Sequence, residues 1–209
     1  MNIILASASP RRREILSLLG IPFEVMPSAC EEAFEETDPA KLVCSLSRQK
    51  GEEVAGRLSA DMENPALVLA ADTIVWFQGR AFGKPANPEE AYETLRTLSG
   101  NTHQVYTGVY LGVVPEQSID IMQNQNQNKA FPRSFSVMSE VTFCPLKEEE
   151  LRWYVSTKEP YDKAGAYAVQ GVFAPFIEKI NGDYYNVMGL PISRVYHELK
   201  QAGIDLLCQ

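Results

Sequence analysis

A turn rich in serine and arginine near the start of the chain could bind phosphate. Ser7-Ala8-Ser9-Pro10 joins an apolar run to a segment with helical spacing, and Arg11, Arg12 and Arg13 follow it. Such a turn offers free backbone N–H groups and the positive end of a helix dipole, while arginine matches phosphate oxygens. Three arginines also oppose that dipole, and a bound anion would relieve the conflict. A capped helix with solvated arginines is the alternative, and spacing alone leaves both open.

Two lysines could add positive charge to the same ligand. Lys50 shares an apolar helical face with Leu46 and Val54, which is uncommon for a solvated lysine. Lys84 lies in Gly83-Lys84-Pro85, a tripeptide that is typical of an ordinary turn. The Walker spacing of a P-loop is absent. Lys84 is therefore a candidate only in combination with other residues.

Carboxylates follow two of the predicted strands. Asp72-Thr73 comes directly after the apolar run 68–71, so we expect Asp72 at a strand end, facing the crevice where open α/β sheets bind ligands. There it could bind Mg²⁺ or orient a water molecule. An Asx-turn after the strand is an equally good interpretation. Glu31-Glu32 could supply a second carboxylate, although such an acidic run is more typical of a solvated face.

The segment from Asp162 to Gly171 combines small residues with a lysine and a glutamine. Glycine and alanine allow the backbone to approach a ligand closely, and the Gln170 amide could read the edge of a base through one donor and one acceptor. A tight, well-packed loop is the alternative.

Composition excludes several classes of protein. The 209 residues are 45% apolar, with a formal charge of -8. This acidity disfavours binding to nucleic acid or to a membrane surface, although it allows a small polyanion in a local basic pocket. The four cysteines form no CxxC pair, which favours a reduced, cytoplasmic setting. No apolar run is long enough to span a membrane, and no signal peptide is indicated.

Strands alternate with helices along the chain, so the predicted fold is α/β, with a mixed sheet flanked by helices. We expect one functional unit over residues 1–209. The polar segment 117–133 is predicted to be a mobile surface loop between two paired strands. The expected strands are 3–6, 22–26, 68–71, 102–114 and 134–143. The expected helices are 10–20, a longer one from 39, one that begins at Pro88, 146–155 and 191–202.

Taken in order, these segments resemble the Maf family of nucleoside triphosphate pyrophosphatases. Each block is modest alone, but their ordered set, running from residue 3 to about residue 196, is highly specific. The blocks are Leu5–Arg12, Ser47–Lys50, Ala71–Val75, Gly83–Pro85, Thr107-Gly108, Asp162–Tyr167, Gln170-Gly171 and Gly182–Pro191. The resemblance implies a twisted mixed sheet with a ligand cleft between two lobes, and a homodimer.

The implied reaction is hydrolysis of a nucleoside triphosphate to its monophosphate and pyrophosphate, with a divalent cation, Mg²⁺ or Mn²⁺. Asp72 matches the family's proton acceptor, and Glu32 would bind the metal with it. Because aspartate is a weak base at neutral pH, we expect Asp72 to bind metal and orient water. The positions that match phosphate-binding residues are Ser7, Lys50 and Lys84. Those that match the dTTP/UTP subgroup are Arg12, Thr73 and Gln170.

Two other functions stay open at this point. The sister subgroup prefers 7-methyl-GTP, and a non-catalytic nucleotide-binding regulator of septum formation would share the same phosphate residues. The chain also departs from the family pattern at Ala29-Cys30, which bears on the metal ligands, and at Ala168-Val169.

Overall fold

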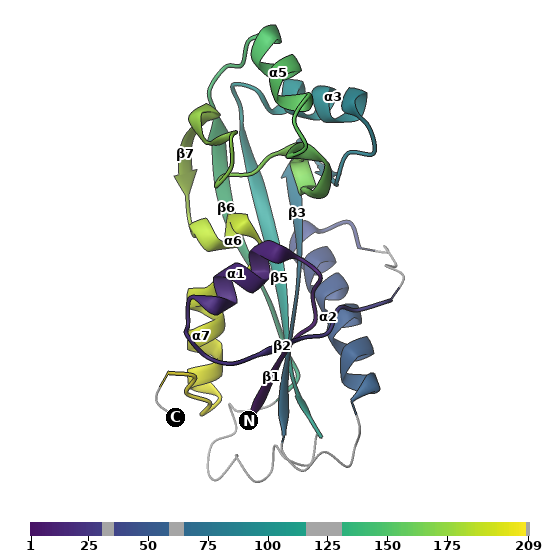
Figure 1. Ribbon diagram of the computed structural model, residues 1–209, viewed down its shortest axis with the longest axis vertical. Helices are drawn as coiled ribbons and strands as arrows, with labels where there is room; N and C mark the ends of the chain where they lie inside the picture. Colours follow the sequence, from purple (N-terminus) through teal and green to yellow (C-terminus); the bar gives the residue numbers. More distant parts are fainter. Residues whose placement is uncertain (31–35, 59–64, 116–130, 208–209) are drawn as a thin grey trace.

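The computed structural model describes residues 1–30, 36–58, 65–115 and 131–207, which form a mixed sheet flanked by helices (Figure 1). Within these ranges the sheet has seven strands in the order β2-β1-β3-β5-β6-β7, with β4 paired to β3. Strand β1 is parallel to β2 and β3, and the other pairings are antiparallel. The predicted mixed α/β fold is confirmed. The strands are β1 Asn2–Leu5, β2 Glu24–Val25, β3 Ala66–Phe77, β4 Arg80–Phe82, β5 Thr102–Val114, β6 Arg133–Phe143 and β7 Ile177–Asn181.

Three helices begin where the sequence pattern places them, with proline in the first turn after a short polar residue. Asp38 Oδ1 accepts from the Lys41 N–H at 3.0 Å, and Asn87 Oδ1 accepts from the Glu90 N–H at 2.9 Å. Ser9 precedes α1 but makes no capping hydrogen bond through its side chain. The helices are α1 Pro10–Ser17, α2 Pro39–Arg57, α3 Pro88–Leu98, α5 Glu148–Val155, α6 Tyr184–Met188 and α7 Ile192–Gln201.

Helices cover the sheet in three groups (Figure 1). Helices α1 and α7 pack on one face, where Ile15 and Val195 join the apolar cluster around Leu69. Helix α2 covers the opposite face, where Leu46 meets Ile74. Helices α3 and α5 lie at the far end of the long strands, beyond the reach of β1. The sheet is therefore covered on both faces in its lower half (Figure 1).

Strand β3 is longer than the sequence interpretation allowed. It was expected to end at Ala71, but it continues to Phe77, so Asp72 lies inside the strand and pairs with Gly108 of β5. The expectation was wrong because Ile74–Phe77 is itself β-branched and aromatic and continues the ladder. Strand β1, however, pairs with β3 only as far as Leu69. Asp72 thus still lies beyond the carboxyl end of β1, on a stretch of β3 that pairs with β5 but not with β1.

Two short strands had not been anticipated. Strand β4 follows a tight turn in which Gln78 and Gly79 both have positive φ, 49° and 80°, as a type I′ hairpin requires. Strand β7 arises within the Gly-rich stretch and pairs with β6. The predicted loop at 117–133 falls largely on residues 116–130, which lie outside the described residues, so its mobility stays a prediction. Across the described ranges, no helix has both the length and the apolar character needed to cross a membrane.

Gly108 allows α2 to lie close against β5, directly opposite Asp72. A Cβ at this position would be 2.1 Å from the Val43 carbonyl oxygen, which belongs to the backbone of α2. Neither the backbone of β5 nor that of α2 can move away without disturbing the packing of the helix on the sheet. We therefore expect Gly108→Ala to lower the free energy of unfolding by about 3 kcal/mol, measured by urea denaturation.

Gly56→Ala is the matched control for that substitution. Gly56 also lies on α2, but no atom lies within 4 Å of the point that a Cβ there would occupy. Alanine there should raise the free energy of unfolding by about 0.5–1 kcal/mol. A Gly108→Ala protein as stable as the wild type would show that α2 does not need this close approach.

Candidate active site

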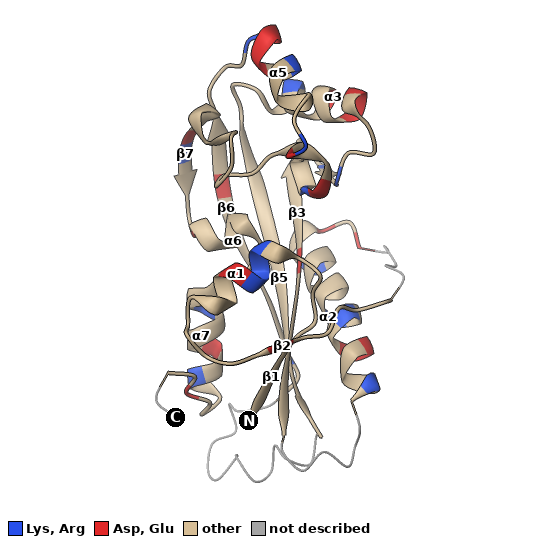
Figure 2. Ribbon diagram, viewed as in Figure 1, with Lys and Arg blue, Asp and Glu red and all other residues tan. Residues whose placement is uncertain are grey.

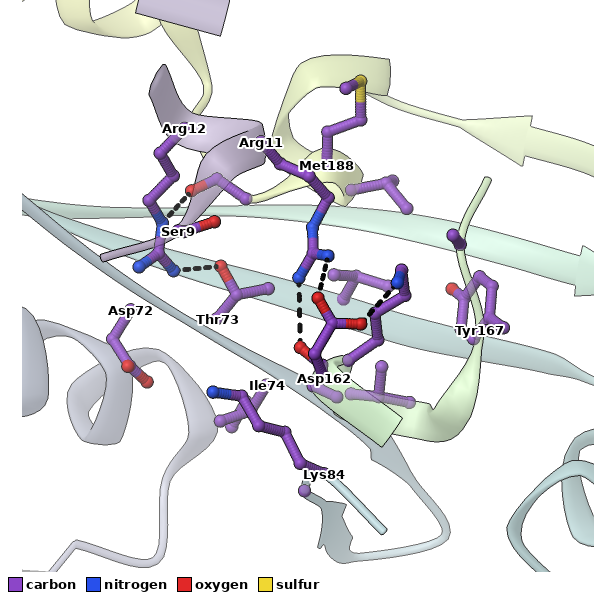
Figure 3. A pocket seen from close by; sticks show the side chains of 18 of the residues that line it. Ser9, Arg11, Arg12, Asp72, Thr73, Ile74, Lys84, Asp162, Tyr167 and Met188 are labelled. Atoms are coloured by element: carbon purple, nitrogen blue, oxygen red, sulfur yellow. Dashed lines mark hydrogen bonds and ion pairs between the residues drawn. The ribbon is translucent and has the colours of Figure 1, made fainter. Parts of the chain in front are cut away.

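A cavity of about 490 Å³ opens beyond the carboxyl end of β1, between α1, α2, β3 and the segment 162–170 (Figure 3). A second hollow of about 330 Å³ adjoins it around the turn Ser7–Pro10. The two are continuous, because six residues line both: Ser9, Arg11, Arg12, Lys50, Lys84 and Asp162. Nearly all the described residues that the sequence singled out for chemistry line one or both hollows.

Lys50 and Asp72 form a close ion pair in this cavity. The Lys50 Nζ lies 2.5 Å from Asp72 Oδ1, and their side chains are only 17% and 13% exposed. Side chains alternate along a strand, so Asp72 faces α2 while Thr73 faces α1. The lysine on an apolar helix face is thereby explained, since its partner on β3 lies under that face. Such a sheltered pair holds the carboxylate in one orientation.

Arg12 reaches across the other face of β3. Its Nε donates to the Gly189 carbonyl oxygen at 2.8 Å, Nη1 to Ser7 Oγ at 3.2 Å, and Nη2 to Thr73 Oγ1 at 3.1 Å. Gly189 has φ of 110°, and a Cβ there would lie 3.3 Å from Thr73 Oγ1. One guanidinium group therefore joins the turn after β1, the middle of β3 and the end of α6.

A buried polar network fixes the direction of the Thr73 hydroxyl. Thr107 Oγ1 donates to the Asn186 carbonyl oxygen at 2.9 Å and lies 2.9 Å from Thr73 Oγ1. Since each hydroxyl has one proton, Thr73 donates to Thr107 and accepts from Arg12. Asn186 is itself fully buried and donates to Val105 and Ser139. Sequence reasoning had not given Thr107 or Asn186 a role. For Thr107, the available signal was a short polar residue inside the β-branched strand β5.

Arg11 links the two sides of the cavity. Its Nη1 lies 3.0 Å from Asp162 Oδ2, and its Nη2 donates to the Asp162 carbonyl oxygen at 3.2 Å (Figure 3). Lys163 Nζ lies 2.5 Å from Asp162 Oδ1. Burial would raise the pKa of Asp162, but the hydrogen bond and charge of Lys163, together with Arg11, lower it overall. Asp162 thus stays charged and joins α1 to the segment that follows α5.

The remaining predicted residues divide into three groups. Lys84 and Gln170 are exposed and line the cavity, and the Gly83 carbonyl oxygen accepts from the Gly165 N–H at 3.1 Å, which ties their two segments together. Arg13 is exposed on α1 and is not among the described lining residues. Glu32 lies outside the described residues, so its metal-binding role stays a prediction.

The cavity is basic although the chain is acidic. Among the described residues that line the main cavity, Arg11, Arg12, Lys50, Lys84 and Lys163 are basic, whereas only Asp72 and Asp162 are acidic. Figure 2 shows the basic start of α1 at the middle of the molecule, while acidic residues lie on the outer helices α2, α3, α5 and α7. The local excess of positive charge suits a small polyanionic ligand.

A buried histidine lies behind the cavity wall. His103 is 1% exposed, and its Nε2 lies 2.8 Å from the hydroxyl oxygen of Tyr167, which lines the cavity. Burial lowers the pKa of His103 from 6.5 to about 3. The unfolded chain therefore takes up this proton at a higher pH than the folded protein. Stability should fall as the pH drops from about 6.5 toward 3, by roughly 1.4 kcal/mol per pH unit from this residue.

His103→Gln tests that contribution, since glutamine does not titrate. Between about pH 7 and about pH 4.5, we expect the wild type to lose roughly 2.5 kcal/mol more stability than the variant. Urea denaturation of both proteins at the two pH values measures the difference. Equal losses in the two proteins would show that His103 is not neutral when folded.

Comparison with known proteins shows the family to which the chain belongs. A protein-family model described as "Maf-like protein" matches residues 2–202. A dTTP/UTP pyrophosphatase of Lachnoclostridium phytofermentans is 45% identical over 208 residues, which cover 100% of this chain and 98% of that protein. One of Carboxydothermus hydrogenoformans is 42% identical over 203 residues, 97% and 100% of the two chains. Among solved structures, the Ham1 protein of Staphylococcus aureus matches 68% of this chain and 72% of its own, at 12% identity and a TM-score of 0.40. Match length and identity to the sequence relatives together establish that the chain belongs to the Maf-like protein family.

Proposed function

We propose that this protein hydrolyses dTTP and UTP to the monophosphate and pyrophosphate. The observation that carries the proposal is a basic cavity built around the sheltered Lys50–Asp72 pair. Relatives of 42–45% identity that match this chain over nearly its whole length are named dTTP/UTP pyrophosphatases, which supports the same substrates here.

The triphosphate would bind at the turn between β1 and α1. Ser7 and Ser9 line the smaller hollow, together with Arg12, Lys50 and Lys84. The smaller hollow is also lined by the first residues of α1, Pro10 to Arg12, and the positive end of the helix dipole favours an anion there. These groups would offset the charge of the phosphates, and the absence of a capping bond from the Ser9 side chain leaves its hydroxyl available.

A divalent cation, Mg²⁺ or Mn²⁺, would take part in this reaction, and among the described residues Asp72 offers it a carboxylate. No group of three metal-ligating side chains occurs in the ranges that the structure describes. Mg²⁺ commonly binds to one or two carboxylates plus the substrate's phosphates and water, so Asp72 with Glu32 would be enough to hold it. When bound, the cation would neutralise charge that develops on the phosphates.

Asp72 would orient the attacking water. Its Oδ1 is paired with Lys50, so its other oxygen, Oδ2, is the one available to accept from water. The water oxygen attacks the α-phosphorus, the bond from that phosphorus to the bridging oxygen breaks, and pyrophosphate leaves. The proton of the water is released to the solvent, because aspartate is a weak base at neutral pH. Arg12 and Lys84 would stabilise the charge on the phosphates during this step, so that positioning and electrostatics contribute most of the rate.

The base would lie at the end of the cavity that Gln170 lines. A glutamine amide offers one donor and one acceptor group, which can pair with the carbonyl and N–H edge of uracil or thymine. The cavity wall near it is apolar, with Val105, Ala168 and Val169. Such a wall suits the flat faces of a base.

A substrate panel tests the proposal. The purified protein is incubated with dTTP, UTP, CTP and 7-methyl-GTP in the presence of Mg²⁺ or Mn²⁺, and the products are identified. Pyrophosphate and monophosphate from dTTP and UTP are expected, and orthophosphate would contradict the reaction. Preference for 7-methyl-GTP would place the chain with the sister subgroup. Tight binding without turnover would favour a regulator of septum formation. The homodimer remains a proposal drawn from the resemblance, and the cytoplasmic setting remains one drawn from the cysteines.

A further inference from the structure

The Glu159 carboxylate is the centre of a set of hydrogen bonds outside the cavity. Its Oε1 accepts from the Tyr154 hydroxyl at 3.0 Å and from the Phe173 N–H at 3.3 Å. Its Oε2 accepts from the Val172 N–H at 3.1 Å. Hydrogen bonds to an ionised carboxylate are stronger than neutral ones, and successive backbone N–H groups form a natural site for an anion. The backbone at 172–173 is therefore fixed by one side chain.

The loop formed by residues 170–173 lies directly against the Glu159 carboxylate. A Cβ on Gly171 would be 2.0 Å from Glu159 Oε2 and 2.3 Å from Oε1. Only glycine allows the backbone to approach so closely. Gln170, the next residue toward the N-terminus, is exposed at the cavity wall. The position of the Gln170 amide thus depends on the contacts that residues 171–173 make with the Glu159 carboxylate.

Glu159 also contacts the other side of the same cavity wall. Its carbonyl oxygen accepts from Lys163 Nζ at 2.8 Å, and Lys163 in turn pairs with Asp162. Asp162 and Lys163 both line the cavity, whereas Glu159 is not among its described lining residues. Glu159 therefore joins two cavity-lining segments from behind the space where a ligand would bind.

We propose that Glu159 is a positioning residue that holds Gln170 against the base and so sets the preference for dTTP and UTP. The inference rests on the proposed function, because it requires Gln170 to contact a base. Tyr154 supplies a side-chain donor to the carboxylate, and Phe173 is fully buried, so the far end of the loop is anchored by packing. Gln170 and Val172 are the exposed residues of the loop 170–173.

Glu159→Gln tests the inference with almost no change in shape. One carboxylate oxygen becomes an NH₂ group that faces the backbone N–H donors, so at least one loop hydrogen bond is lost. We expect the KM for UTP and dTTP to rise about tenfold while kcat changes less than about threefold. The ratio of kcat/KM for UTP to that for GTP should fall about tenfold. A residue that serves only stability would not change KM and base preference together.

Tyr154→Phe is the matched control. It removes the hydroxyl donor to the same carboxylate but leaves both backbone N–H groups in place, so KM and the UTP-to-GTP ratio should stay within about twofold of the wild type. If Glu159→Gln does not fold, Gly171→Ala replaces it, since its Cβ would push the loop from the carboxylate without altering Glu159. This variant should change KM and the ratio in the same direction.

The outcomes separate the two hypotheses. A wild-type protein that hydrolyses neither UTP nor dTTP would overturn the proposed function itself. An active wild type, with folded Glu159→Gln or Gly171→Ala proteins whose KM and base ratio are unchanged, would overturn the positioning role alone. An equal fall in kcat for every nucleotide at constant KM would also overturn it.

Discussion

Asp72→Asn is expected to reduce kcat for pyrophosphate release from UTP by about 10³-fold. Asparagine keeps the size of the side chain but loses the negative charge that would bind a cation and orient the attacking water. The KM should change much less, because Arg12, Lys84 and the turn before α1, which line the proposed phosphate site, are unaltered. Pyrophosphate release under saturating UTP and Mg²⁺ measures the effect.

The ion pair with Lys50 makes a second test possible. In Asp72→Asn the Lys50 ammonium loses a partner at 2.5 Å in a sheltered position, so stability should also fall, by about 1–3 kcal/mol. Combining it with Lys50→Met should restore part of that stability without restoring activity. This combination separates the role of Asp72 in the fold from its role in the reaction.

Asp38→Asn is the control for the substitution itself. Asp38 caps α2 and is not among the described residues that line the cavity, and asparagine caps a helix about equally well. Activity and stability should therefore stay near wild-type values. If Asp72→Asn kept more than about a tenth of the wild-type kcat, the assignment of Asp72 to the reaction would be wrong.

Arg12→Ala is expected to lower kcat/KM for UTP and dTTP by about 10²–10³-fold. The substitution removes three hydrogen bonds, to Ser7, Thr73 and Gly189, along with a positive charge at the proposed phosphate site. Hydrogen bonds to charged groups contribute about 1.5–3 kcal/mol each, and about 1.4 kcal/mol corresponds to a factor of ten. Initial rates over a range of nucleotide concentrations measure the loss.

Two further variants locate the cause of that loss. Arg12→Lys keeps the charge but not the planar fork that reaches three elements, so we expect a loss of only about tenfold. Arg13→Ala removes the exposed arginine next in sequence, outside the described lining, and should leave kcat/KM within about twofold. If Arg12→Ala and Arg13→Ala behaved alike, the network around Thr73 would have no part in activity. An unchanged preference between UTP and 7-methyl-GTP in Arg12→Ala would contradict its part in base selection.

Elements with a strong local signal were predicted well. The bounds of β5 agree with the expected strand 102–114, and β6 begins one residue before the expected position. Both are long, β-branched strands, and their ladder runs along most of their length. Helices α2 and α3 begin at the predicted prolines, because the capping residue, the proline and the first turn lie next to one another in sequence.

Predictions that depended on distant partners were less complete. Asp72 was expected at the end of a strand because the apolar run stops there, yet the ladder to β5 and the β4 hairpin carry the strand past it. Glu159 was not recognised at all, since a glutamate before proline has no local signal of function. Its partners at 172–173 come close only after the loop folds back.

The sequence alone determined the residue types of the site and the order in which the chain presents them: the Ser7–Arg12 turn, Lys50, Asp72-Thr73, Lys84 and Gln170. These lie in short segments whose chemistry can be recognised without knowledge of their neighbours. Only the tertiary structure decided which of them meet. Lys50 pairs with Asp72 because Gly108 lets α2 approach β5, and Arg12 meets Thr73 because β1 ends short of it. Such contacts depend on register and packing between segments far apart in sequence, and the local pattern of residues carries no record of either.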